Sequence, residues 1–519
     1  MFPEKIHRYI FLFGLLGLGF GMMIGAVPTS VPQIILLCNW LAEGKFKWKF
    51  ETLKSNRLFW VLGSVFLLHV IGLIYTQNWE EGLKDVKTKA PLLLLPLVFF
   101  STKPISLKEF YGVLYCFIVG CLANTAWCLL YSFVLHTQDV LRDTSRFMSH
   151  IRLGLYLNVA IVTCSYFGIK SQNNYKRSAW FLVAVYFVLV LYILGLASGL
   201  INFMILFLLG LCAIIYRQKL LFKLAGLVIF VIAVALVTNY ISGIKDAQLI
   251  VKETPNNIPQ QFSPSGRAYI HFEKNGQKEN GNYIQINVQP EELQLAWKKQ
   301  FPADSFNYEA KHNLQRYAVL IRYLASKGQN KDSAGFAQLN ETDKRNIQKD
   351  ISNYEYPFWS YLHKRTYELV NEYDEFIHHR FVNGHSLTMR LYFWKAGLHL
   401  AGKNLIAGVG TGDVQQELNK AYIETESPLY TEWFKRPHNQ FLTITVALGI
   451  IGLILFFISI FYPAITLRQH LSKLYWPFFI IAFLSFFLED TLETQAGCTF
   501  YAFFNTLFLS VAWFRKYST

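Results

Sequence analysis

A histidine and an asparagine stand where the chain enters one of its last long apolar runs. His438 and Asn439 precede the apolar run 444–460, which contains Gly449-Ile450-Ile451-Gly452. A histidine at a membrane mouth can act as a general base or, as a cation, bind a phosphate. Taken alone, the pair is explained more simply as interfacial polar residues at the start of a helix. The chemistry therefore needs further support from elsewhere in the chain.

Two arginines in other polar segments could bind an anionic substrate. Arg390 has Trp394 four residues later, so on a predicted helix both residues share one face. Arg152 stands at the mouth of another predicted apolar helix. A guanidinium group is a planar, permanently charged fork that can grip two phosphate oxygens at once. Either arginine could therefore bind a phosphate group; the simpler alternative is that each is a solvated surface residue.

An acidic turn precedes the last apolar run of the chain. It contains Glu489, Asp490 and Glu493. These carboxylates could orient His438, bind an acceptor hydroxyl or balance the charge of the arginines. The residue types alone leave a catalytic and a structural role equally open.

The elements that must position these residues are membrane helices. Of 519 residues, 53% are hydrophobic and only 16% are charged, whereas a soluble domain carries roughly 25% charged residues. The apolar residues gather into runs that match a hydrocarbon core about 30 Å thick. We read the first run as a helix and not as a cleaved signal peptide. The twelve predicted segments are 9–27, 29–42, 58–75, 89–101, 109–135, 151–169, 179–197, 199–216, 220–241, 438–464, 474–490 and 496–514.

The distribution of lysine and arginine predicts the orientation. The formal net charge is +15, and the excess basic residues lie in alternate short loops, which is typical of the cytoplasmic side. Both termini are therefore expected in the cytoplasm, and no nucleic-acid partner is expected. The predicted organisation is a membrane bundle over 1–241, a large extracytoplasmic loop over 242–437 and a second membrane bundle over 438–519.

The large loop is long enough to be structured and functional. We predict a hairpin over 267–288, a helix starting at Pro290, and helices over 307–326, 342–381 (broken near Pro357) and 387–401. None of the seven cysteines falls in this loop, so disulfides do not hold it together. The glycine-rich stretch 408–412 follows a helix instead of a strand, so we read it as a turn and not as a nucleotide site.

Several of these motifs together resemble the O-antigen ligase and O-antigen polymerase superfamily. His438-Asn439, nine residues and then Gly449-x-x-Gly452 is similar to the signature of that superfamily. Arg390-x-x-x-Trp394, Gly408-Val409-Gly410 and the acidic turn that leads to Gln495-Ala496-Gly497 resemble its flanking segments. The resemblance covers the twelve-helix layout and, most specifically, residues 386–505.

The resemblance implies an all-α polytopic membrane protein, similar to C-type membrane glycosyltransferases, in the inner membrane of a bacterium. Such proteins transfer a glycan from undecaprenyl pyrophosphate to a hydroxyl acceptor, with inversion at the anomeric carbon, and we expect no cofactor and no metal site. His438 would accept the proton or bind the sugar–phosphate junction, while Arg390 and Arg152 would clamp the pyrophosphate. The other expected substrate-binding residues are Asn439, Trp394, Arg436, Glu489, Asp490 and Glu493.

The sequence departs from the family pattern at one position. The family carries an arginine after a Ser-x motif, but here Ser198-Gly199 is followed by Leu200. Either Arg152 or Arg436 would have to supply the second guanidinium.

The expected partners are the lipid-linked glycan, the membrane lipids and the lipid A-core as acceptor, which makes O-antigen ligase the favoured function. A polymerase or a protein O-glycosylating enzyme of the same family is the alternative. A polysaccharide flippase or transporter is an alternative of another class, but it would require ionisable residues deep within the spans. A non-catalytic envelope assembly factor is the third, and it would not depend on His438.

Overall fold

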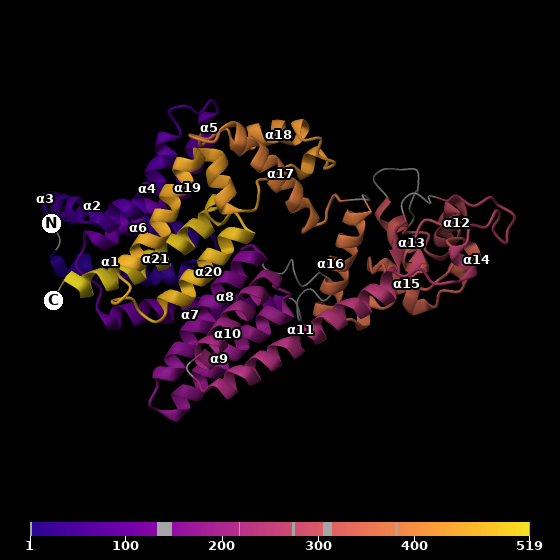
Figure 1. Cartoon of the computed structure of the whole chain (residues 1–519), viewed down its shortest axis with the longest axis horizontal. Coiled ribbons are helices and arrows are strands. Elements are labelled where there is room, and N and C mark those ends of the chain that lie inside the picture. Colours follow the sequence, from indigo (N-terminus) through magenta and orange to yellow (C-terminus); the bar gives the residue numbers. More distant parts are fainter. Residues whose placement is uncertain are drawn as a thin grey trace. The chain divides into compact units, whose positions relative to one another are not determined.

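The computed structural model of the chain describes residues 3–131, 148–216, 218–271, 276–304, 314–378 and 382–517. Within these ranges the chain is helical, with one two-stranded sheet (Figure 1). It divides into two compact units. Unit 1 contains residues 1–214 and 389–519, and unit 2 contains residues 215–388.

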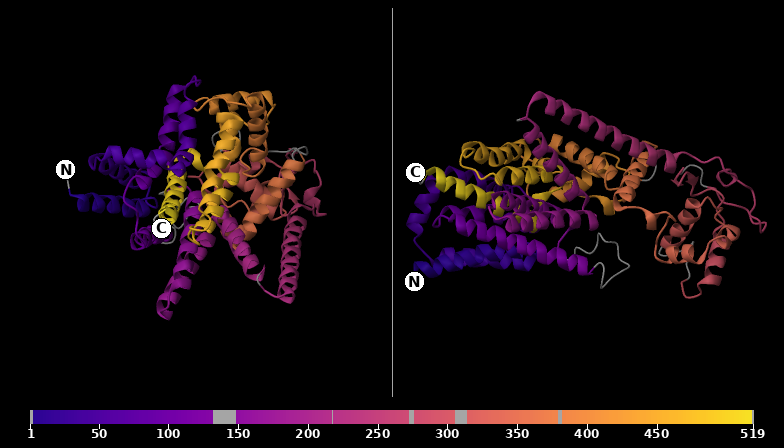
Figure 2. Two further views of the ribbon diagram at one scale, coloured as in Figure 1. Left: turned by 60° about the vertical axis from the view of Figure 1, so that its left-hand side comes forward. Right: turned by 90° about the horizontal axis from the view of Figure 1, so that it is seen from below.

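Unit 1 is built from long apolar helices, and each predicted segment before residue 217 or after 437 falls on one of them. The start of α1 and the end of α21 lie at the same end of the unit (Figure 2). The predicted topology, with both termini on one side, requires this arrangement. Its α-helices are α1 (Glu4–Gly21), α2 (Ala26–Ala42), α3 (Phe46–Ser55), α4 (Arg57–Ile71), α5 (Trp79–Lys89), α6 (Pro91–Phe100), α7 (Leu107–Leu130), α8 (His150–Lys170), α9 (Asn174–Ile193), α10 (Ala197–Tyr216), α17 (Thr388–Lys403), α18 (Val414–Glu424), α19 (Gln440–Thr466), α20 (Tyr475–Leu488) and α21 (Gln495–Tyr517).

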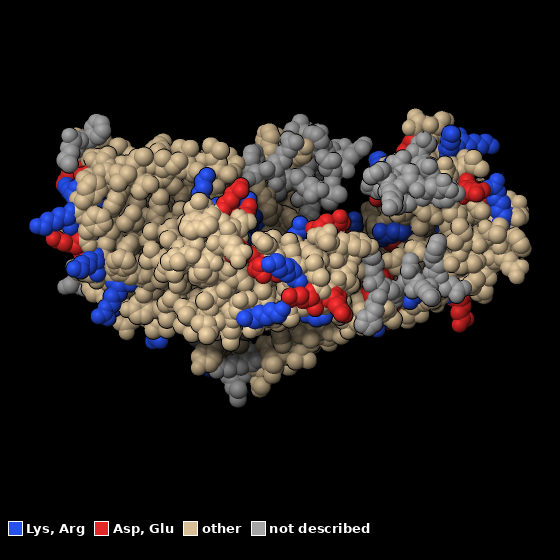
Figure 3. Space-filling view, turned by 90° about the horizontal axis from the view of Figure 1, so that it is seen from above, with Lys and Arg blue, Asp and Glu red and all other residues tan. Residues whose placement is uncertain are grey.

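The lengths and compositions of these helices identify a membrane protein. In the part of the chain that the structure describes, seven helices are long and apolar enough to cross a membrane, namely α7, α8, α9, α10, α19, α21 and most of the unit 2 helix α11. The helices α2, α4 and α20 are apolar but shorter. The all-α membrane fold is therefore confirmed, and the total of twelve spans stays a prediction. Figure 3 shows broad uncharged surface, with lysines and arginines at the end that holds the termini.

The core of unit 1 is centred on α21. Every residue of α21 from Gly497 to Ala512 is buried. The Phe504 ring packs edge-on against Phe117 at a centroid distance of 4.9 Å, and Phe500 packs in the same way against Tyr156 of α8 at 5.0 Å. Such edge-to-face aromatic pairs add to the free energy gained by burying the rings. This packing holds the start of α8 beside the turn that precedes α21.

Unit 2 contains α11 (Leu220–Leu249) and the folded part of the predicted loop. Its core gathers Leu293 and Trp297 of α12 (Pro290–Gln300) with Leu320 and Leu324 of α13 (Leu314–Ser326) and Ile347 of α15. The remaining elements are β1 (Lys278–Glu279), β2 (Asn282–Tyr283), α14 (Ser333–Ala337), α15 (Glu341–Gln348), α16 (Tyr361–Ile377) and the 3-10 helices η3 (Pro255–Asn257) and η5 (Tyr356–Phe358).

The predicted loop elements are found with shifted bounds. The helix at Pro290 is confirmed, but the strands of the hairpin have only two residues each. The helical region 342–381 separates into α15, η5 and α16, because Pro357 cannot donate a backbone hydrogen bond. Residues 305–313 and 379–381 lie outside the described residues. The helix expected over 387–401 is α17, and it packs within unit 1.

Candidate active site

The backbone at His438 has an unusual conformation that one carboxylate holds in place. His438 has φ 49°, in the left-handed region that side-chain-bearing residues seldom adopt. Its N–H donates to Asp490 Oδ2 at 2.9 Å, and the N–H of Asn439 donates to Asp490 Oδ1 at 3.0 Å. The Thr443 hydroxyl donates to the same Oδ1 at 2.6 Å. Asp490 thus fixes the turn from which the His438 side chain projects.

Asn439 serves the helix that follows. Its side-chain oxygen accepts the N–H of Leu442 at 3.1 Å and so caps the first turn of α19. Asn439 was predicted to bind substrate, and the structure shows this residue in a structural contact.

A second carboxylate links His438 to Arg390. Glu489 Oε2 lies 3.0 Å from His438 Nδ1, and Glu489 Oε1 accepts a hydrogen bond from Arg390 Nη2 at 2.7 Å. A carboxylate can only accept, so Nδ1 carries the proton and Nε2 is left to face a ligand. Glu489 therefore sets the tautomer and the orientation of the imidazole. His438 and Arg390 lie 51 and 99 positions before Glu489 in the sequence, and the fold brings the three residues together.

The charges around His438 favour its protonated form. Burial by itself lowers the pKa of His438, but the hydrogen bond and the charge of Glu489 outweigh it and raise this pKa above its ordinary value. Burial also raises the pKa of the Asp490 carboxyl, against the effect of the Thr443 hydrogen bond. The imidazole can therefore serve as a strong base when neutral and as a phosphate-binding cation when protonated.

Helix α17 supplies one wall of the site. The Trp394 indole N–H donates to the Pro437 carbonyl at 3.0 Å. The Phe393 ring lies 5.7 Å from the His438 ring, centroid to centroid. Trp394 and Phe393 thus fix the segment that carries His438, and Arg390 projects from the preceding turn of the same helix.

The glycine loop (residues 408–413) holds the start of α19 through backbone hydrogen bonds. Helix α19 is broken at Gly449, which has φ 64°. The break leaves two carbonyls of α19 without their usual partners, and the N–H groups of Val409 and Gly410 donate to Val446 and Ala447 at 2.9 and 3.0 Å. A Cβ on Gly408 would lie 2.4 Å from Ala447 backbone atoms, so this approach requires glycine. The prediction of a turn at 408–412 is confirmed.

The other side of the glycine loop is tied to α4 and α5. The Thr411 hydroxyl donates to the His69 carbonyl at 2.7 Å. Asp413 accepts the N–H groups of Gln77 and Asn78, each at 2.8 Å. The loop therefore connects the start of α19 to the end of α4 and the start of α5.

The last acidic residue of the turn belongs to a separate, paired cluster. Glu493 forms ion pairs with Arg436 and with Lys89, the latter at 2.9 Å, and Lys89 also binds Asp85 at 2.6 Å. Burial alone would raise the pKa of Glu493, but Lys89 and Arg436 lower it below its usual range. Gln440 joins the cluster through its amide, 3.1 Å from Glu493. Arg436 and Glu493 are thus brought into a neutralised cluster and not to His438.

Arg152 stands at a small pocket beside the same turn. The pocket has a volume of about 130 Å³ and is lined by the first turn of α8, by Gln495 and Ala496 of α21, and by α2. Arg152 Nε is buried and meets no hydrogen-bond acceptor among the residues that the structure describes. The guanidinium lies within electrostatic reach of Glu489. In contrast to Arg436, Arg152 forms no ion pair with a described carboxylate.

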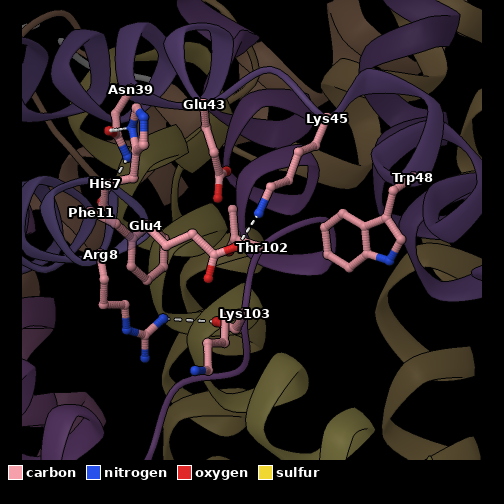
Figure 4. A pocket seen from close by; sticks show the side chains of 10 residues that line it. All are labelled: Glu4, His7, Arg8, Phe11, Asn39, Glu43, Lys45, Trp48, Thr102 and Lys103. Carbon is pink, nitrogen blue, oxygen red and sulfur yellow. Dashed lines mark hydrogen bonds and ion pairs between the residues drawn. The ribbon is translucent and has the colours of Figure 1, made fainter. Parts of the chain in front are cut away.

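A larger pocket lies at the opposite end of α2, and its charges are mostly paired. Its volume is about 340 Å³, and Figure 4 shows Lys45 pointing to Glu4 and Arg8 pointing to the backbone of Lys103. Arg8 also binds Glu109. The predicted catalytic and substrate-binding residues line no part of this pocket.

Residues 354–457 match the family model described as O-antigen ligase. This segment is similar to the O-antigen ligase family. The resemblance inferred from the sequence is therefore confirmed. A comparison with curated proteins finds no match to the chain.

The matched segment 354–457 contains only part of the assembled site. It includes Arg390, Trp394, the glycine loop, His438 and the break at Gly449. The acidic turn and Arg152 lie outside it; the turn contacts His438, and the packing of α8 against α20 and α21 holds Arg152 near that turn.

Sequence reasoning missed several residues of this site. Phe393, Lys89, Asp85 and Gln440 carried no motif that marked them. Only the adjacency of Phe393 to Trp394, and of Gln440 to Asn439, could have suggested them.

Proposed function

We propose that this protein transfers a glycan from undecaprenyl pyrophosphate to a hydroxyl acceptor at the outer face of the inner membrane. The observation that carries the proposal is the Glu489–His438 pair. It fixes the proton on Nδ1 and leaves Nε2 for a ligand, while the same carboxylate binds the Arg390 guanidinium and lies within electrostatic reach of Arg152. A base next to cations suits the attack of a hydroxyl on a sugar that is linked to a pyrophosphate.

In the proposed step, the acceptor oxygen attacks the anomeric carbon as the bond from that carbon to the phosphate oxygen breaks. His438 Nε2 takes the proton of the acceptor hydroxyl, and the lipid pyrophosphate leaves with the bonding electrons. Glu489 stabilises the imidazolium that forms. Attack opposite the leaving group inverts the anomeric centre.

The developing negative charge on the pyrophosphate requires cations at fixed positions. Arg390 presents its guanidinium from α17 and remains about one quarter exposed. For the second guanidinium we favour Arg152 over Arg436, because Arg436 belongs to the cluster of Glu493, Lys89 and Asp85, whereas Arg152 forms no ion pair with a described carboxylate. Arg152, at the start of α8, would then take the place of the arginine that the family carries where this chain has Leu200.

We assign the acceptor as the lipid A-core, so that the protein acts as an O-antigen ligase. Support comes from the matched family model, which is described as a ligase. A polymerase or a protein glycosylating enzyme would use the same step with another hydroxyl. A flippase and an assembly scaffold are less well supported, because neither needs a histidine whose tautomer is fixed by a carboxylate.

The test is to replace His438 by alanine and to measure transfer in vesicles that contain a lipid-linked glycan and the lipid A-core. Loss of a general base typically reduces the rate by about 10²- to 10⁴-fold. His399 provides a matched control, since its imidazole lies 3.0 Å from Glu424 and is equally exposed at 36%. His399→Ala is expected to leave the rate unchanged.

The products distinguish the possible functions. In cells, His438→Ala in a ligase leads to accumulation of lipid-linked polymer without attachment, whereas in a polymerase it leaves single repeat units. Normal long-chain surface glycolipid in the His438→Ala variant would rule out the proposed chemistry.

A further inference from the structure

Helix α11 of unit 2 provides a measure of membrane depth. Its apolar stretch starts after Lys223 and ends near Ile241, with Thr238 and Asn239 as its polar members, before the polar residues Ser242, Lys245 and Asp246. Eighteen residues at 1.5 Å each cover about 27 Å, close to the thickness of a bilayer core. Tyr240 then stands at the membrane–water boundary, where tyrosine is enriched.

A hydrogen bond to Tyr240 holds another segment of unit 2 beside this end of α11. The Tyr240 hydroxyl lies 2.8 Å from His363 Nδ1, and the two rings are 5.7 Å apart, centroid to centroid. His363 is in the first turn of α16, directly after η5. The segment 356–362 is therefore held beside the boundary end of α11.

This segment presents apolar side chains that the protein does not cover. Phe358 is 86% exposed and Leu362 is 56% exposed. Trp359, between them, packs against His363 at 4.7 Å and Tyr367 at 5.1 Å, so the backbone that carries Phe358 is firmly held. An anchored, protruding Phe–Leu pair is unfavourable in water and favourable in an apolar phase.

A basic residue follows the exposed pair in the sequence and contacts the start of the same segment. The Lys364 ammonium lies 5.0 Å from the Tyr356 ring centroid, and among the described residues it forms no ion pair. Lysines beside aromatic residues are favoured at the level of lipid phosphates.

We propose that residues 356–362 insert into the lipid leaflet at the Tyr240 end of α11. Phe358 and Leu362 enter the acyl region, Trp359 and Tyr240 lie at the headgroup level, and Lys364 faces the lipid phosphates. The occupant of this surface is the bilayer itself, because the contact of His363 with Tyr240 holds the segment at the end of the apolar, exposed stretch of α11. Unit 2 is then held to the membrane at two places, and this inference does not depend on the proposed catalytic role.

The test uses a photoreactive phenylalanine in place of Phe358 in the full chain, reconstituted in vesicles of phosphatidylethanolamine and phosphatidylglycerol. After illumination, mass spectrometry measures the fraction of protein carrying a phospholipid adduct. The exposed Phe230 of α11 serves as the lipid-facing reference, and the exposed Leu295 of α12 as the water-facing reference. Because all three side chains are exposed, the substitution does not disturb the core.

The expected result is a phospholipid yield at position 358 close to that at 230, and on the order of tenfold above that at 295. A yield at 358 no higher than at 295, with position 230 reacting normally, would overturn the proposal. Crosslinks from 358 to protein in place of lipid would overturn it too. As a second measurement, Lys364→Ala should reduce the adduct yield at 358 in vesicles with anionic lipid.

Discussion

Glu489 and Glu493 lie at the two ends of the acidic turn, and their carboxylates differ in exposure and in binding partners. Glu493 is 8% exposed and is bound by Lys89, which is 1% exposed, and by Arg436, which is 27% exposed. Glu489, four residues earlier, is shared between Arg390 and His438, which remain 26% and 36% exposed. The comparison shows that one turn can contain a closed cluster that stabilises the fold and an open cluster that can meet a substrate.

The largest expected effect concerns the closed cluster. Glu493→Ala removes the carboxylate that the buried Lys89 shares with the partly exposed Arg436, and breaking a buried pair such as Lys89–Glu493 typically costs about 3–5 kcal/mol. Unfolding of the purified protein in detergent measures the loss. Glu417→Ala, which breaks the exposed pair with Lys420, is the control and should cost at most about 1 kcal/mol. Equal stability of the two variants would show that the closed cluster is not structural.

A smaller effect separates the two candidate arginines. A hydrogen bond to a charged group contributes about 1.5–3 kcal/mol, so Arg152→Ala should raise the KM for the lipid-linked donor by roughly 10- to 100-fold. The same change at Arg436 should mainly lower stability, because Arg436 neutralises Glu493. Steady-state kinetics in vesicles measure the donor KM of the two variants, and unfolding curves measure their stability. If Arg436→Ala alone raises the donor KM, the assignment of Arg152 is wrong.

The smallest effect is a shift in pH dependence at the open cluster. Glu489 outweighs burial and raises the pKa of His438, so removing its charge in Glu489→Gln lowers that pKa. A base must be neutral, so transfer in the unmodified protein rises as the pH passes upward through the His438 pKa. In Glu489→Gln the rise should begin at lower pH and reach a lower plateau. Transfer rates measured between about pH 5 and 9 give the pH at which the rate rises, and Glu424→Gln is the control in which this pH should not change.

Composition and periodicity predicted the membrane helices well, because apolar runs near 20 residues are rare outside membrane-spanning segments. They did not predict α18, whose eleven residues follow the glycine loop without a long apolar stretch. The division of the region 342–381 was visible only at Pro357, and its exact bounds depend on packing within unit 2.

The site was predictable as a set of residues but not as a set of pairings. His438, Arg390, Glu489 and Asp490 were all named from motifs, yet nothing in the sequence shows that Glu489 binds both His438 and Arg390. Nor could spacing separate Glu489 from Glu493, since the partners of each come from distant helices. Hydrogen bonds between residues 50 to 400 positions apart follow from tertiary packing alone.

The break in α19 has a mechanical consequence. A continuous membrane helix tilts to match bilayer thickness, and any residue at its mouth moves with it. At Gly449 the helix changes direction, and the first segment is bound to the glycine loop, which is itself bound to α4 and α5. Because these contacts hold the first segment, we expect tilting of the second segment to displace His438 less than it would in a continuous helix, so that activity depends little on lipid composition.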